Sequence, residues 1–346
     1  MGQAKWAKLG KAEAFKTSEL QALEIEGVKI ALSFRDGKFG AISGNCLHFG
    51  GPLGKGTLSE QDYVVCPWHS WQFHRMTGEA RPGIPAAVPK FEVKEENGEL
   101  FINLNALTQA KHAHHPAHPL SREIKRAEGP LRVAGISTTV MNQDFPRYST
   151  SEELLKVSME HAASKHGAET KLIRLNDLKF RACEGYYSKN EKACTWPCTI
   201  TQMDPKDELS VVYDVFVHWA DIVIVSTPIR WGNASSLYYK MTERMNAIQN
   251  QMTVAGKSLI RDKTAAFIIT GGQDNIQAVA GQMLTFFGEL GFAFPKFPFI
   301  AHSRGWSAED MENNVAFVQQ SEKLRESACE LVNRAVENAN QLVFKK

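Results

Sequence analysis

The sequence predicts two domains of different fold class: a small antiparallel β domain, followed by an α/β domain built on a five-stranded parallel sheet. The first hundred residues read as short strands with turn signals between them, whereas strands and helices alternate after Leu131. A polar segment without apolar periodicity separates the two patterns. At 346 residues the chain is long enough for two domains, which we place at 1–106 and 131–346.

Four stretches of the first domain combine β-branched and aromatic residues. The turn signals DGK, NGE and PG occur in the intervening sequence, and no helical stretch of useful length interrupts it. We therefore expect strands at 28–34, 62–68, 91–96 and 99–104.

The segment 107–130 between the domains carries the histidines His112, His114, His115 and His118. One interpretation is a metal-binding cluster, and the other is a solvated linker. We expect a linker, because the prolines keep the segment extended and no acidic or cysteine partner lies nearby.

The second domain alternates apolar strands with helices. We expect its strands at 131–137, 171–175, 221–227, 264–270 and within 292–300. A capping box formed by Thr150 and Glu153 opens the first helix, which Gly167 ends. Further helices are expected at 206–220, 235–251, 274–291 and after Ala308. Five strands alternating with helices suit a sheet of order 2-1-3-4-5.

Two short motifs in the first domain supply metal ligands. Cys46 and His48 stand in a C-x-H pair, and Cys66 and His69 form a C-x-x-H pair. Two thiolates on one iron and two imidazoles on the other are the ligand set of a Rieske 2Fe–2S centre. A zinc site is disfavoured, because the C-x-H spacing is shorter than the two to four intervening residues typical of zinc ligand pairs.

The stretch from about 5 to 105 resembles the Rieske ferredoxins and the Rieske domains of ring-hydroxylating oxygenases. It reads CPWHSWQF, with Ser70 where that family usually has glycine. Residues 46–69 contain only the two ligand cysteines, which indicates the ferredoxin or oxygenase type and a potential on the order of −150 mV. The resemblance places His48 and His69 on exposed loops. The chain lacks the D-x-x-H-x-x-x-x-H string expected for the mononuclear iron of an oxygenase.

Three loops after strands of the second domain are suited to a flat, phosphorylated ligand. Hydroxyl side chains and the N-terminus of a helix follow its first strand and favour phosphate, whereas GxGxxG and a Walker A lysine are missing. These loops resemble those of the NADPH-dependent FMN reductase group of flavodoxin-like proteins. By that resemblance, the phosphate ligands would be Ser137, Ser149, Thr150 and Ser151. The flavin ring would lie on Thr227, Pro228, Ile229, Arg230, Trp231, Gly232, Asn233, Thr270, Gly271, Gly272 and Gln273.

Two departures from that reductase pattern concern arginines. The first loop is longer than usual and Arg147 would substitute there, while Arg230 replaces the usual tyrosine beside Trp231. A cation at this position would favour the anionic reduced flavin.

An insertion between the second and third strands of this domain holds Cys183, Cys194 and Cys198. Related iron–sulfur flavoproteins place four cysteines there, and Tyr186 stands at the fourth position. A 4Fe–4S cluster needs four ligands, so we expect a substrate-covering loop in which Tyr186 and Trp196 would cover the flavin.

Charge and hydropathy exclude several classes of function. A net charge of +2 does not favour nucleic acid or an anionic membrane, and no apolar run approaches a membrane span. Six cysteines do not form the framework of a secreted protein. We expect a cytoplasmic protein, and the reductase resemblance implies a homodimer or homotetramer.

The combination predicts a redox flavoprotein in which NAD(P)H reduces FMN and single electrons pass through the Rieske centre to or from a partner protein or small molecule. The alternative is an FMN-dependent reductase of a small substrate or quinone, with the Rieske domain as a redox-sensing or docking module. No catalytic residue and no nicotinamide motif can be assigned from the sequence.

Overall fold

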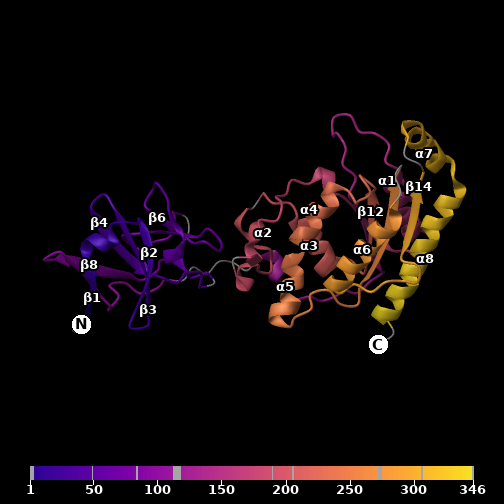
Figure 1. The fold of residues 1–346 in the computed structure, drawn as a ribbon. Helices are drawn as coiled ribbons and strands as arrows, with labels where there is room; N and C mark the ends of the chain where they lie inside the picture. Colours follow the sequence, from indigo (N-terminus) through magenta and orange to yellow (C-terminus); the bar gives the residue numbers. More distant parts are fainter. Residues whose placement is uncertain are drawn as a thin grey trace. The chain divides into compact units, whose positions relative to one another are not determined.

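The computed structural model describes residues 4–48, 50–82, 85–111, 118–188, 190–204, 206–271, 275–304 and 307–344. The chain divides into two compact units, whose elements are shown in Figure 1. The first unit comprises Met1–Pro116 and Tyr186–Ala193, and the second comprises Ala117–Gly185 and Cys194–Lys346. The division differs from the predicted one, because a segment from within the α/β sequence belongs to the first unit.

The first unit is built from two antiparallel sheets. The larger sheet has the order β1-β9-β8-β4-β3-β2 and the smaller has the order β5-β6-β7. The strands are β1 (Trp6–Lys11), β2 (Leu20–Ile25), β3 (Val28–Arg35), β4 (Lys38–Ser43), β5 (Thr57–Leu58), β6 (Tyr63–Val65), β7 (Gln72–His74), β8 (Lys90–Glu96) and β9 (Glu99–Asn103). Three predicted strands correspond to β3, β8 and β9. The remaining predicted strand, 62–68, corresponds to the shorter β6, because the chain turns at Cys66.

Strand β3 is buried on both faces, which explains its run of apolar residues. Ile30 and Leu32 pack with Leu100 and Ile102 in one core. Ala31, on the opposite face, belongs to a second core that also contains Cys46 and Cys66. Alternation along the strand thus separates a purely structural core from the core that supports the cysteine ligands.

The second unit contains a parallel sheet of order β11-β10-β12-β13-β14. Its strands are β10 (Arg132–Ser137), β11 (Glu169–Arg174), β12 (Ile222–Pro228), β13 (Thr264–Gly271) and β14 (Phe299–Ser303). This is the predicted order 2-1-3-4-5, and the prediction of a flavodoxin-like sheet is confirmed. The last strand begins at Phe299, near the end of the predicted 292–300 stretch.

Eight α-helices accompany this sheet among the described residues. They are α1 (Thr150–His166), α2 (Thr199–Met203), α3 (Ser210–Asp214), α4 (Ser236–Arg244), α5 (Asn246–Ala255), α6 (Ile276–Leu290), α7 (Ala308–Gln320) and α8 (Glu322–Phe344). The predicted helix 206–220 is α3 followed by a π-helical turn at Val215–Trp219, and the predicted helix 235–251 divides at Met245. The N-cap of α1 is Ser149 rather than Thr150, and Gly167 ends the helix with φ +63°.

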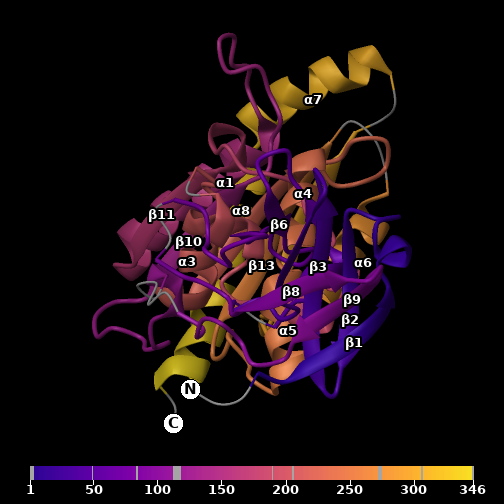
Figure 2. The same cartoon turned by 90° about the vertical axis from the view of Figure 1, so that its left-hand side faces the viewer.

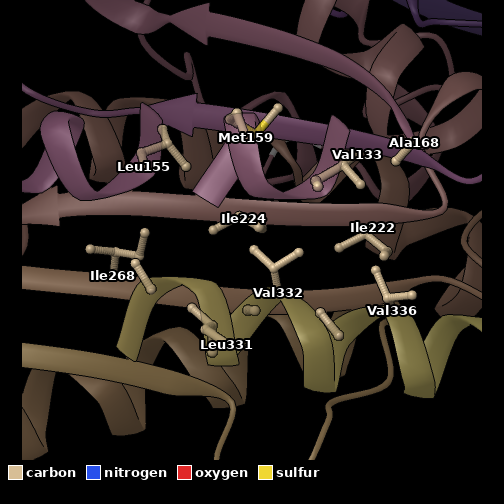
Figure 3. Packing of buried hydrophobic residues seen from close by; sticks show 14 of the residues in the cluster. Val133, Leu155, Met159, Ala168, Ile222, Ile224, Ile268, Leu331, Val332 and Val336 are labelled. Atoms are coloured by element: carbon tan, nitrogen blue, oxygen red, sulfur yellow. The ribbon is translucent and has the colours of Figure 1, made fainter. Parts of the chain in front are cut away.

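The two faces of the sheet are covered by different helices: in Figure 1, α6 lies on one side of the sheet and α8 on the other, and Figure 2 gives the view turned by 90°. Ile268 of β13 packs with Leu155 and Met159 of α1 and with Leu331 and Val332 of α8 (Figure 3). The neighbouring side chain, Phe267, points the other way and meets Phe287 of α6, with ring centroids 5.2 Å apart. Within the described part of the chain, no helix is long and apolar enough to span a membrane.

Candidate functional sites

The two ligand loops of the first unit share one backbone hydrogen-bond frame. In the loop after β4, the Cys46 N–H donates to the carbonyl of Gly51, at 2.8 Å. In the loop after β6, the Cys66 N–H donates to the carbonyl of Trp71, at 2.7 Å. Each cysteine therefore opens a turn of the same length, and the histidine lies inside that turn.

The frame requires a left-handed residue four positions after each cysteine. The N–H groups of Gly50 and Ser70 donate back to the carbonyls of Cys46 and Cys66, at 2.9 and 3.0 Å. The φ angles of Gly50 and Ser70 are +74° and +55°. This conformation costs a residue with a side chain about 1–2 kcal/mol. The positive φ angle thus explains why the family usually has glycine at the position of Ser70.

The imidazoles of His48 and His69 converge on a common point. Their Nδ1 atoms lie 3.1 Å apart, close to the roughly 3.3 Å expected for two nitrogens that share a tetrahedral metal with bonds of about 2.0 Å. Cys46 and Cys66 are buried in the core between the loops. A side chain at Gly51 would place its Cβ 2.7 Å from the sulfur of Cys66. The donor set and the space around it fit a Rieske centre.

A Rieske centre needs only two protein ligands on each iron. Among the residues that the structure describes, no group of three or more His, Cys, Asp or Glu side chains is placed to hold a single metal ion. Two cysteines and two histidines match the ligand number of a Rieske centre.

The prediction that both histidines lie on exposed loops is wrong for His69. Its side chain is 1% exposed, and its Nε2 lies 2.8 Å from the carbonyl oxygen of Ala193. The ring also faces Tyr186, with centroids 6.1 Å apart. Because a carbonyl only accepts, Nε2 carries the proton and the Nδ1 lone pair is left for a metal. Tyr186 thus covers His69, a predicted cluster ligand, whereas the sequence predicted it to cover a flavin. His48 is half-buried and stacks on Trp71, at 5.0 Å.

Three hydroxyl groups meet at the N-terminus of α1. Thr139 Oγ1 lies 2.8 Å from Ser149 Oγ and 3.2 Å from Ser151 Oγ, and the two serine oxygens are 3.3 Å apart. We call these three residues the hydroxyl cluster. Thr139 was not among the predicted phosphate ligands, although its position directly after the first strand of the sheet was a usable signal. Hydroxyls at the start of a 17-residue helix suit an anion.

The other two predicted phosphate ligands are engaged elsewhere. Ser137 donates to Glu152, at 2.8 Å, and Glu152 also accepts from Arg174, at 2.7 Å. Burial raises the pKa of Glu152, but the bonds from Arg174 and Ser137 outweigh it and leave the pKa below its ordinary value. Thr150 pairs with Thr270, at 2.6 Å, and so joins α1 to the end of β13.

A pocket of about 510 Å³ adjoins the hydroxyl cluster. Thr139 and Ser149 lie on its wall together with three cationic side chains, those of Arg147, Lys156 and Arg174. Glu152, Glu153 and Asp177 also line the pocket, and Glu152 pairs with Arg174 and with Lys156. The Arg147 cation and the two hydroxyl donors are groups that bind phosphate, and they fit the phosphate end of FMN.

The loop after β12 forms a tight turn that presents an aromatic side chain. Arg230 and Asn233 exchange backbone hydrogen bonds of 2.7 and 2.9 Å. The two central residues, Trp231 and Gly232, have φ angles of +49° and +70°, as a type I′ turn requires. Trp231 is 89% exposed. The Asn275 side chain donates to the Gly232 carbonyl, at 2.5 Å, which joins the loops after β12 and β13.

Most of the remaining residues predicted to contact the flavin ring are buried beneath these loops. Thr227, Pro228, Ile229 and Thr270 are buried at the ends of β12 and β13. A side chain at Gly271 would place its Cβ 2.8 Å from the Ile229 Cβ, so glycine is needed for the two strand ends to approach. Gly272 and Gln273 lie outside the described residues.

Of the three cysteines of the insertion, Cys198 contacts a buried ion pair. Arg244 binds Asp207 through two hydrogen bonds of 2.9 and 2.7 Å and also donates to Cys198, at 3.3 Å. Burial raises the pKa of Cys194 to about 11 and also raises that of Cys183. A raised pKa makes the reactive thiolate form of these two side chains less populated.

Of the histidines in the predicted linker, only His118 lies in the described part of the chain. Its Nδ1 accepts from the Leu120 N–H, at 3.2 Å, and caps the short turn Pro119–Ser121. His112, His114 and His115 lie outside the described residues.

Trp196 is the other residue predicted to cover the flavin. It packs edge-on against Tyr213, with ring centroids 5.5 Å apart.

Comparison with known proteins finds a matching family model for a stretch of each unit. Residues 5–95 match the family model of the Rieske 2Fe–2S domain, and residues 146–306 match that of NADPH-dependent FMN reductase. A human Rieske domain-containing protein is 27% identical over 115 residues, which cover 28% of this chain and 73% of that protein. The ferredoxin component of the alkene monooxygenase system of Xanthobacter autotrophicus is 27% identical over 89 residues, or 26% and 73%.

The second half resembles flavin-processing proteins. The 8-demethyl-8-aminoriboflavin-5′-phosphate synthase of Streptomyces davaonensis is 24% identical over 138 residues, which cover 38% of this chain and 48% of the synthase. The chain thus spans about half the length of that relative. The crystal structure of RosB with bound 8-demethyl-8-formylriboflavin-5′-phosphate has a TM-score of 0.48 at 19% identity and covers 61% of this chain and 80% of its own.

These matches bear out the predicted cofactors, a 2Fe–2S cluster and FMN with NAD(P)H. The ligand geometry of the first unit and the flavodoxin-like sheet of the second agree with them. The chain is an oxidoreductase-type flavoprotein that joins a Rieske 2Fe–2S domain to an NADPH-dependent FMN reductase domain.

Proposed function

We propose that the chain converts between two-electron and one-electron transfer, with NAD(P)H and FMN on one side and the Rieske centre on the other. A bound flavin exchanges a hydride with a nicotinamide and single electrons with an iron–sulfur centre. Each NAD(P)H oxidised therefore supplies two electrons, which leave through the cluster one at a time. The observation that carries the proposal is the presence of both donor sets, in fitting geometry, in one chain.

Phosphate binding is the role we propose for the hydroxyl cluster and the cationic wall beside it. The hydroxyls would donate to the phosphate oxygens, and Arg147 would supply a charge-assisted bond. The synthase relative is named for making a riboflavin-5′-phosphate derivative, which supports this assignment because FMN is riboflavin-5′-phosphate. The turn that carries Trp231 would hold the ring, with the Arg230 cation beside it.

Arg147 and Arg230 support an anion site from opposite loops. Withdrawal from water lowers the pKa of Arg230, and the like charge of Arg147 lowers it further. Two cations that repel one another in the same region are both stabilised when an anion binds between or beside them. Both arginines are therefore expected to favour the flavin phosphate or the reduced, anionic ring.

Anaerobic stopped-flow spectroscopy with NADPH and with NADH tests the proposal. In the native protein the flavin should bleach first, and the cluster should then be reduced. The matched variant Cys66→Ser, which cannot form the cluster, should show flavin bleaching alone. Bleaching of the flavin while the cluster stays oxidised in the native protein would contradict the proposed coupling.

The closed surroundings of His69 favour a second candidate, in which the Rieske unit senses redox state and the reductase domain works alone on a small acceptor. The two candidates differ in steady-state turnover. If Cys66→Ser retains full NAD(P)H oxidation with quinone acceptors and with ferricyanide, a one-electron oxidant, the second candidate is favoured. A selective loss of activity with the one-electron acceptor favours the first.

A further inference from the structure

A short segment of the α/β sequence folds as part of the first unit. Tyr186–Ala193 interrupts the residues of the second unit along the chain but belongs to the compact unit formed by Met1–Pro116. It contains two short 3-10 turns, Tyr186–Ser188 and Glu191–Ala193. Ala193 is completely buried and Tyr186 is 8% exposed, so the segment is packed at both ends.

Both ends of this segment touch His69. The Ala193 carbonyl accepts from His69 Nε2 across 124 residues of sequence, and the ring of Tyr186 lies over the imidazole with an interplanar angle of 24°. The equivalent cover of His48 comes from within the ligand loops, because Trp71 stacks on it at 6°. The two histidine ligands are therefore covered by different parts of the chain.

The contact with Ala193 acts on the ligand itself. A carbonyl that accepts from Nε2–H fixes the tautomer and makes Nδ1 a stronger donor to the metal. Stronger donation and exclusion of water both favour the oxidised cluster, and hydrogen bonding and solvent exposure are among the factors that set the potential of iron–sulfur centres. Loss of the segment should shift the potential upward on both counts.

We propose that the segment Tyr186–Ala193 is a built-in cover of the Rieske centre, which positions His69, lowers the potential of the cluster and closes the His69 side to outside proteins. Electron exchange with an external partner then takes place on the side of His48. The Ala193 carbonyl is bonded to the nitrogen of Cys194, so the cover also connects His69 to the sequence of the reductase domain through one hydrogen bond and the main chain.

The test is the midpoint potential of the cluster, measured by mediated titration with EPR detection in the full-length protein. Tyr186→Ala should raise the potential by an amount that changes the reduction equilibrium about tenfold, or about 59 mV for one electron. Tyr187→Ala is the matched control, because the neighbouring tyrosine is 52% exposed and should leave the potential unchanged. Tyr186→Phe keeps the ring and should restore the native value.

A second variant removes the whole contact. Replacing residues 186–193 with eight glycines and serines should raise the potential at least as much as Tyr186→Ala and should speed oxidation of the cluster by ferricyanide. If both variants bind iron and keep the native potential and oxidation rate, the cover is overturned. If the cluster no longer assembles in either variant while it does in Tyr187→Ala, the positioning of His69 is supported. Mediators replace NAD(P)H here, so the outcome is independent of the proposed coupling.

Discussion

The cluster site and the candidate flavin site differ in how much of the chain each requires. Residues 46–69 carry every proposed ligand of the cluster, held on two turns of identical hydrogen-bond pattern. The flavin loops draw on residues from Thr139 to Asn275, brought together by the order of a parallel sheet. The cluster site lies on a short stretch of chain, so its sequence motif is enough to locate it. The flavin site is assembled by tertiary contacts, so its residues depend on which polar side chains are already hydrogen-bonded to other parts of the protein.

The largest effect is expected from Cys66→Ser, which removes one ligand of the local site. Iron should fall from about two atoms per chain to nearly none, while bound FMN should be unchanged because the flavin loops share no residue with the cluster loops. Iron and flavin analysis of the purified protein measures both. Cys329→Ser is the control, because this half-buried thiol on α8 is far along the sequence from any ligand. Loss of FMN together with iron would break the distinction between the two sites.

The next largest effect concerns the buried ion pair of the second unit. Arg244→Met leaves the carboxylate of Asp207 buried without its cation, and both side chains are completely inaccessible. We expect a loss of about 3–5 kcal/mol in the free energy of unfolding, measured by urea denaturation. Arg122→Met breaks a far more exposed pair with Asp214 and should cost at most about 1 kcal/mol. Equal losses in the two variants would show that burial does not govern this region.

The Arg244–Asp207 pair also predicts that the free energy of unfolding changes with pH in opposite directions in the native protein and in Arg244→Met. Burial raises the pKa of Asp207, but Arg244 outweighs it and holds the pKa below its ordinary value. The stabilisation is therefore complete above the unfolded pKa of about 3.9 and is lost as the pH falls below it. In Arg244→Met the opposing charge is gone and burial is countered only by the hydrogen bonds from the Arg181 N–H and the Thr201 hydroxyl. We expect the folded pKa of Asp207 to rise, so the variant should gain stability relative to the native protein between pH 7 and pH 5. Parallel curves would contradict this account.

An intermediate effect on FMN affinity distinguishes the hydroxyl cluster from Ser137, which the sequence predicted to bind the phosphate. Ser149→Ala should weaken FMN binding by about 1.5–3 kcal/mol, or roughly 10- to 150-fold, because this hydroxyl lines the pocket and a hydrogen bond to a charged phosphate is lost. Ser137→Ala should leave the dissociation constant within about twofold, since this hydroxyl already donates to Glu152. Flavin fluorescence quenching measures both constants. The reverse ranking would restore Ser137 as the phosphate ligand.

The smallest effect compares the two turns of the cluster site. Ser70→Gly should stabilise the first unit by about 1 kcal/mol, because it relieves the positive φ. Gly50→Ser should destabilise it by a similar amount, as a Cβ at Gly50 meets no atom within 4 Å and only the backbone is affected. Thermal unfolding with iron content as a control tests both. Changes of the same sign would show that the two turns are not equivalent.

The strand order could be predicted from the sequence, and the cluster ligands could be proposed from it, because both depend on local patterns. Apolar runs define β10 to β13, and the spacing of Cys46, His48, Cys66 and His69 defines the loops. The burial of His69 could not be predicted, since its cover lies 124 residues away. Ser137 and Thr139 both follow the first strand, and only the structure shows that Glu152 engages one and Ser149 the other.

The discontinuity of the first unit has a consequence for its synthesis. The ligand loops leave the ribosome long before the segment that closes over His69, since about 70 residues separate Pro116 from Tyr186. At about 5–20 residues per second this interval lasts several seconds. During translation the nascent chain therefore presents an open pair of ligand loops, to which iron and sulfide carriers have access, and only the later synthesis of Tyr186–Ala193 completes the enclosure.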